Sequence, residues 1–327
     1  MYLSHFGLNE PPFRITPHTD FFYEGANRGA TLEALLYAIG HDEGIVKVTG
    51  EVGTGKTMLC RVLMERLPSS VETIYLANPS LARDEILIAL ADELKLGLDD
   101  ARGTRVLRGL QEALIRLYGE GRRVVVLIDE AHAMQRETLE EVRLLSNLEA
   151  NRHKLLQIVL FGQPELDDEL NTVEMRQLKE RITHSFRLAP LGQLDVESYI
   201  DFRLRAAGYR GPMPFTKGAL RLISAASEGL TRRVNILADK SLLAAFAASS
   251  HSVGEREAKR AIDDSQFYRP ARTSYRTVLA AVLLAGVVAG FGIAVCAVWA
   301  WIALSLGRRY ENVTGDHKAA LAEAAAE

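Results

Sequence analysis

The feature that most restricts the fold of this chain is a glycine-rich run between an apolar segment and a stretch with helical spacing. Its residues are Gly50, Glu51, Val52, Gly53, Thr54, Gly55, Lys56 and Thr57. Their order fits a phosphate-binding loop (P-loop), in which glycines let the backbone turn tightly and direct N–H groups at an anion. A chance glycine-rich turn would not require a strand before it and a helix after it. Both are predicted here.

We therefore expect these eight residues, together with Met58, to bind the phosphates of ATP. The helix that follows the loop adds its positive N-terminal end to the site. Lys56 would supply a mobile point charge for the β- and γ-phosphates, and Thr57 would supply a hydroxyl for Mg²⁺.

Two carboxylates follow the five apolar residues 124–128, a run that predicts a parallel strand covered on both faces. Ligands bind at the carboxyl ends of such strands. Asp129 is expected to hold the Mg²⁺ shell, and Glu130 to orient or deprotonate the attacking water. The alternative is that the two carboxylates form a solvated acidic turn, but the presence of a complete P-loop in the same chain favours the nucleotide site. For His132, a structural hydrogen bond explains the residue as well as a catalytic role.

Four polar side chains are candidates for contacts with the γ-phosphate. Gln163 follows the next predicted strand, where the alternative is a loop-capping role. Arg176 and Arg181 lie around the end of a predicted helix, and either could serve the site of a neighbouring subunit or lie on a solvated face. Arg232 opens a later helix and could couple its movement to hydrolysis, or it too could be solvated.

Strand-like and helix-like segments alternate as far as Pro190, which predicts a doubly wound α/β domain with a parallel sheet. Beyond Pro190 the chain shows helical spacing and no evident strand. The predicted division is 1–190 for the α/β domain with its N-terminal arm, 191–268 for a small helical domain, 269–276 for a basic linker, 277–306 for a transmembrane helix and 307–327 for a short tail.

The transmembrane prediction depends on the run 278–306, which contains no charged residue. About 20 apolar residues suffice to cross a bilayer. Trp299 and Trp301 lie near one end of the run, where aromatic interface anchors are expected. A buried core helix is the alternative, but core helices seldom run this long without a charge.

Composition restricts the partners and the compartment. The formal net charge is −3, so no broad basic surface indicates nucleic acid. The two cysteines, Cys60 and Cys296, fall in different predicted environments, which fits a reducing compartment.

With these motifs the chain resembles the ExeA/GspA-type branch of the AAA+ ATPases, which serve general secretion and pilus biogenesis, and within it the MshM-like proteins of mannose-sensitive haemagglutinin (MSHA) pilus assembly. The segments that carry the resemblance are Met1 to Leu8 with Pro12-Phe13, Thr49 to Thr57, Leu127 to His132, Phe161 to Leu166, and Gly229 to Asn235.

The resemblance implies an AAA+ core with a helical lid that forms a homo-oligomer. It also implies that Gln163 is sensor 1, Arg181 the arginine finger and Arg232 sensor 2. The family usually has proline where Thr231 stands here. The longer secretion ATPases also carry a peptidoglycan-binding domain after the membrane span. About twenty residues follow the span in this chain, so direct cell-wall binding is not expected.

The implied function is ATP-driven assembly of a secretion or type IV pilus complex with an envelope partner protein. ATP and reducing conditions place the N-terminal domain in the cytoplasm and the single-pass anchor in the bacterial inner membrane. An ATPase of exopolysaccharide export remains an alternative that the sequence does not separate. A DNA-associated ATPase of the transposition-helper kind is a third reading, although such a protein needs no membrane span.

Overall fold

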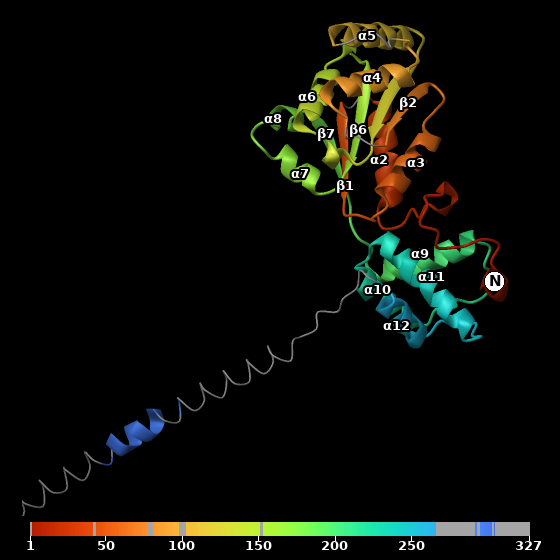
Figure 1. Cartoon of the computed structure of the whole chain (residues 1–327), viewed down its shortest axis with the longest axis vertical. Helices are drawn as coiled ribbons and strands as arrows, with labels where there is room; N and C mark the ends of the chain where they lie inside the picture. The colour runs from red at the N-terminus through yellow and green to blue at the C-terminus, as the bar shows by residue number, and fades with distance from the viewer. Residues whose placement is uncertain are drawn as a thin grey trace, which may run out of the picture. The chain divides into compact units, whose positions relative to one another are not determined.

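The computed structural model describes residues 2–41, 44–77, 81–97, 103–150, 153–265, 292, 295–302 and 304. The chain divides into two compact units, Met1–Tyr268 and Arg269–Glu327. The first unit contains the central sheet and the helices that are labelled in Figure 1.

The sheet of the first unit has five strands, all paired in parallel, in the order β2-β3-β6-β1-β7. The strands are β1 (Ile45–Gly50), β2 (Val71–Leu76), β3 (Arg123–Ile128), β6 (Leu156–Gly162) and β7 (Ile182–Leu188). The predicted α/β architecture with a parallel sheet is therefore confirmed. The sequence did not predict β7, an edge strand with polar residues along much of its length.

Helices cover both faces of the sheet (Figure 1). They are α2 (Arg28–Gly40) and α3 (Lys56–Arg66) on one face, and α4 (Arg83–Glu93), α5 (Thr104–Gly119) and α6 (Arg136–Leu145) on the other. Strand β3 shows why five apolar residues in a row were needed. Val125 and Leu127 pack into the core beneath α2 and α3, whereas Val124, Val126 and Ile128 pack into the opposite core. Side chains of a strand alternate between faces, so a strand covered on both faces is apolar throughout.

Shorter elements connect the strands at the edges of the sheet. They are the 3-10 helix η2 (Ala131–Ala133), the hairpin β4 (Glu149–Ala150) and β5 (His153–Lys154), and the helices α7 (Glu165–Leu170) and α8 (Arg176–Lys179).

After β7 come four helices, here called the α9–α12 bundle. They are α9 (Gln193–Ala206), α10 (Lys217–Ser227), α11 (Thr231–Ala247) and α12 (Glu255–Asp263). The N-terminal arm, with α1 (Tyr2–Phe6) and η1 (Thr19–Phe21), packs against this bundle. Its side chains Phe6, Leu8, Phe13 and Phe21 belong to the same hydrophobic core as the bundle helices. Phe22 belongs instead to the core between the sheet and helices α2 and α3, so the arm contacts both the bundle and the α/β part of the chain.

The predicted linker 269–276 and tail 307–327 lie outside the described residues, and so does most of the predicted transmembrane helix 277–306. Within the described part of the chain, no helix is both long enough and apolar enough to cross a bilayer.

Candidate functional site

The glycine-rich run forms a tight loop between β1, which ends at Gly50, and α3, which begins at Lys56. Gly53 and Gly55 have φ angles of +81° and +101°, a region that L-residues with a side chain rarely adopt. At Gly50, an added Cβ would stand 2.8 Å from the carbonyl oxygen of Leu188 on β7. These three positions therefore require glycine.

The carbonyl groups of this loop are occupied by donors from inside and outside the loop. The Thr54 hydroxyl donates to the Glu51 oxygen at 2.9 Å. The buried Nζ of Lys56 donates to the oxygens of Gly50 and Glu51 at 2.7 and 3.1 Å. The oxygens of Gly53 and Thr54 accept from α11 and from Arg28, as described below. Since the carbonyls are held in this way, an anion at the start of α3 would meet the N–H side of the loop.

Burial lowers the pKa of Lys56, and the charges of Glu130, Asp129 and Glu51 oppose that shift. The ammonium group is held by carbonyl oxygens and has no ion-pair partner among the described residues. A phosphate would give this buried charge a stronger partner than a carbonyl does.

Asp129, at the carboxyl end of β3, is buried and accepts three hydrogen bonds. The donors are the Thr57 hydroxyl at 2.8 Å, the Tyr75 hydroxyl at 3.3 Å and the Glu130 N–H at 2.9 Å. Thr57 and Asp129 thus place a hydroxyl and a carboxylate side by side, the oxygen ligands that suit Mg²⁺ beside a triphosphate. The sequence analysis missed Tyr75. Burial, with the Asp129 charge second, raises its pKa to about 12, so it remains a neutral donor.

Glu130 and Gln163 meet at the same edge of the sheet. The Gln163 amide donates to the Glu130 carboxylate at 3.3 Å, and the same nitrogen lies 2.7 Å from Nε2 of His132. His132 therefore makes a structural hydrogen bond, which is one of the two roles that the sequence allowed for this residue. Glu130 has a φ of +54°, which turns the half-buried carboxylate out of the line of β3.

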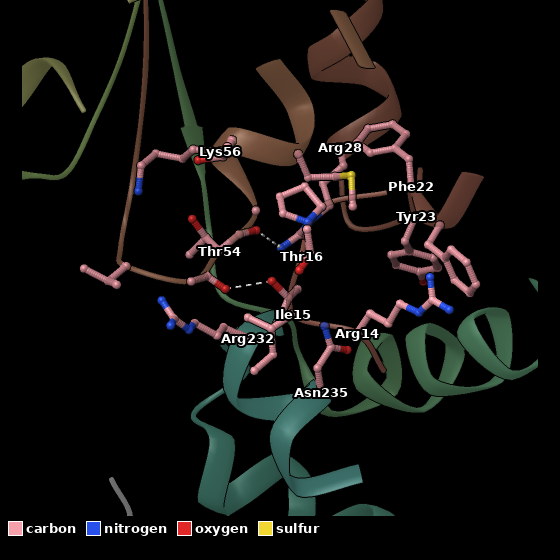
Figure 2. Close-up of a pocket in the computed structure, with 18 of the residues that line it drawn as sticks. Arg14, Ile15, Thr16, Phe22, Tyr23, Arg28, Thr54, Lys56, Arg232 and Asn235 are labelled. Carbon is pink, nitrogen blue, oxygen red and sulfur yellow. Dashed lines mark hydrogen bonds between the residues drawn. The ribbon is translucent and has the colours of Figure 1, made fainter. Parts of the chain in front are cut away.

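The P-loop, the N-terminal arm and α11 enclose a cavity of about 350 Å³. Figure 2 shows Lys56 and Thr54 on the loop side, Ile15 on the arm side, and Arg232 and Asn235 on α11. Glu130 and Gln163 also line the cavity. The arm contributes apolar and aromatic side chains, so the cavity has an ionic half and an apolar half, as nucleotide pockets need.

Two buried arginines that the sequence did not indicate also line this cavity. Arg28 donates to the carbonyl oxygens of Thr54 at 3.2 Å and Ala189 at 3.3 Å. Arg203 donates to the Pro12 oxygen at 2.6 Å and lies over the Phe21 ring at 4.6 Å. No carboxylate of a described residue lies within ion-pair distance of either guanidinium, and burial lowers the pKa of both. The cavity is therefore favourable for an anion.

The two candidate arginine fingers, Arg176 and Arg181, precede β7 and so lie toward the amino ends of the strands, away from the P-loop. The Arg181 oxygen accepts from the N–H of Ile45, which begins β1, whereas Gly50 ends it. Five residue steps in a strand span about 17 Å, too far for Arg181 to reach the P-loop of its own chain. Arg176 is exposed and paired with Glu180 at 3.0 Å. Arg181 lines a second cavity, and its guanidinium has no hydrogen bond or ion pair with a described residue.

The chain is similar to known proteins in both sequence and structure. Residues 39–170 match the family model described as an AAA domain. The chain is 43% identical over 254 residues to the general secretion pathway protein A of Aeromonas hydrophila, which covers 77% of this chain and 46% of that protein. The chain thus spans about half the length of that relative. The resemblance to the ExeA/GspA-type ATPases is confirmed at this level.

A second relative is the ATP-dependent target DNA activator B of Escherichia phage Mu, 30% identical over 208 residues, or 59% of this chain and 63% of that protein. Among solved structures, the Aeropyrum pernix ORC1 protein in complex with DNA aligns with a TM-score of 0.58 at 16% identity, covering 78% of this chain and 69% of that chain. The ORC2 protein of the same organism, in ADPNP-ADP complexes, aligns with a TM-score of 0.56 at 17% identity, covering 76% and 72%. These structures show a shared fold.

The role of Tyr75 can be tested through the Mg²⁺ requirement. Tyr75→Phe removes one of three donors that hold the buried Asp129 carboxylate. We expect the Mg²⁺ concentration for half-maximal ATP hydrolysis to rise about threefold to tenfold, the effect of losing one hydrogen bond of ordinary strength. Tyr118→Phe, which changes a tyrosine on α5 in the opposite core, is the control and should leave it unchanged. Equal Mg²⁺ dependence in all three proteins would show that Tyr75 does not position Asp129.

Proposed function

We propose that this chain, an AAA-domain protein related to general secretion pathway protein A, binds ATP with Mg²⁺ and hydrolyses it. The observation that carries the proposal is the hydrogen bond between Thr57 and Asp129 beside the buried ammonium of Lys56. It joins the two motifs of a nucleoside triphosphatase at one cavity. The apolar wall formed by the arm is suited to the base.

Each side chain is proposed to have a separate role, which depends on where it lies in the site. Lys56 would exchange two carbonyl partners for the β- and γ-phosphates. Thr57 and Asp129 would hold Mg²⁺, which neutralises charge on the transferring phosphoryl group. Glu130 would orient or deprotonate the water, with Gln163 placed beside it to contact the γ-phosphate.

Arg232 lines the cavity from α11. It would bring a charge from the α9–α12 bundle to the phosphates, so that the bundle serves as a lid over the nucleotide.

Two substitutions separate binding from chemistry. Lys56→Ala should weaken ATP binding and abolish turnover, because the phosphates lose their main point charge. Glu130→Gln should keep ATP binding while hydrolysis falls by about 10²- to 10⁴-fold, the usual contribution of a general base. Fluorescent-nucleotide titration and phosphate release measure the two quantities separately. A Glu130→Gln protein that hydrolysed ATP at the normal rate would remove Glu130 from the mechanism.

We further propose a homo-oligomer in which Arg181 acts on the nucleotide of a neighbouring chain. Three facts support it: the guanidinium is unpaired among the described residues, it lines a cavity, and it is remote from its own P-loop. Arg176 is less suited, because Glu180 already pairs with its charge.

Arg181→Ala should therefore lower hydrolysis by about 10³-fold or more, the contribution of a finger supplied in trans. Arg176→Ala removes only an exposed ion pair and should have little effect. Mixing Arg181→Ala with Lys56→Ala protein should restore part of the activity, because a mixed boundary joins an intact finger to an intact P-loop. Failure to restore activity at any ratio, with co-assembly demonstrated, would exclude an intersubunit site.

The cellular process is proposed from the relative that is 43% identical: ATP-driven assembly or regulation of a secretion or type IV pilus complex, with a partner protein of the envelope. Exopolysaccharide export is the nearest alternative. The similarity to a phage DNA activator keeps a DNA-associated function as a third candidate. Stimulation of ATP hydrolysis by duplex DNA would favour that third function over the first.

Residues 277–306 are proposed to anchor the chain in the bacterial inner membrane as a single-pass segment, with the AAA domain in the cytoplasm. The uncharged run 278–306 supports this, and the described side chains Val298, Trp299 and Trp301 within it are exposed. The full chain should remain with membranes after carbonate extraction, whereas a chain ending at Tyr268 should not. Complete release of the full chain would contradict the anchor.

A further inference from the structure

The start of helix α11 has no capping side chain of its own. Its N-cap residue is Leu230, which offers no side-chain acceptor to the first turn. The first four N–H groups of any helix lack partners inside the helix. Here the N–H of Arg232 donates to the carbonyl oxygen of Gly53 at 3.1 Å. A P-loop carbonyl therefore performs the capping of this helix.

Thr231, the first residue of α11, adds a second bond to the same acceptor. Its hydroxyl donates to the Gly53 oxygen at 2.7 Å. Thr231 is 9% exposed as a whole residue, so breaking this bond would leave a largely buried donor unpaired. The helix lies directly on the loop, because a Cβ added to Gly53 would stand 2.9 Å from Cβ of Arg232.

From these contacts we propose that Thr231 is a positioning residue that holds α11 on the P-loop and thereby slows the release of a bound nucleotide. The proposal rests on the nucleotide binding set out above. The loop that would bind the phosphates is the loop that caps α11, and α11 also carries Arg232 and Asn235 into the cavity. Holding the helix against the loop therefore keeps this wall of the cavity in place.

The simpler explanation is that Thr231 only starts a helix. Proline distinguishes the two, since it is favoured at the first position of a helix. Leu230 has φ −76° and ψ 116°, the extended conformation that a residue before proline adopts. No described residue accepts a hydrogen bond from the N–H of Thr231. Thr231→Pro should thus preserve the helix start and remove only the hydroxyl contact with Gly53.

The test is the rate at which a fluorescent ADP analogue leaves the purified full-length chain, followed by stopped flow with excess ADP. Thr231→Pro and Thr231→Val should release the analogue about twofold to tenfold faster than the unmodified chain, the effect of losing one hydrogen bond. Thr231→Ser keeps the hydroxyl and should release it at the unmodified rate.

A matched variant controls for the stability of the bundle. Thr216 caps helix α10, where its side chain accepts from the Ala219 N–H at 3.2 Å, and it is not among the residues that line the cavity. Thr216→Val should lower the melting temperature without changing the release rate. Equal acceleration by Thr216→Val and Thr231→Val would mean that bundle stability, and not the contact with Gly53, sets the rate.

The remaining outcomes separate the two proposals. If the unmodified chain binds the analogue and Thr231→Pro and Thr231→Val release it at the unmodified rate, the positioning role is wrong while nucleotide binding stands. Fast release from Thr231→Ser would contradict the role as well. If the unmodified chain does not bind the analogue, the proposed nucleotide site fails, and the role of Thr231 fails with it.

Discussion

The P-loop backbone is the constraint on which the rest of the structure depends. Its carbonyl groups need donors, and three parts of the chain supply them: Lys56 from α3, Arg28 from α2, and Thr231 with the Arg232 N–H from α11. Each of these bonds occupies a loop carbonyl, which leaves the N–H groups of the loop to meet an anion. Sheet and bundle are thus joined through the loop, and a change in the loop on nucleotide binding would reach both.

The parallel sheet explains where the other candidate residues lie. The carboxyl ends of β1, β3 and β6 meet at one side of the sheet, so the P-loop, Asp129 and Gln163 converge, although Gln163 lies more than a hundred residues after the P-loop. Arg181 precedes β7 and therefore lies at the amino edge. That polarity separates Arg181 from its own nucleotide site, which is why a contact with a second copy of the chain is proposed for it.

The sequence predicted the elements whose residues are neighbours along the chain. The P-loop is one continuous run of residues, and β3 with the two carboxylates after it is another, so spacing and periodicity predicted both. The sequence did not predict β7, because an edge strand alternates partly exposed polar residues and gives no apolar run. It also missed Tyr75 and Arg28. These contact Asp129 and Thr54 only through the packing of β2 and α2, and nothing in their local sequence indicates a partner more than twenty residues away.

The P-loop and α11 are expected to respond to a nucleotide as one unit. Hydrogen–deuterium exchange of the full chain, with and without ATP and Mg²⁺, tests this directly, since it reports the opening of each segment separately. The prediction is that ATP slows exchange in peptides covering 50–57 and 230–235 together. Slower exchange in 50–57 with no change in 230–235, or no change in either segment, would contradict the account.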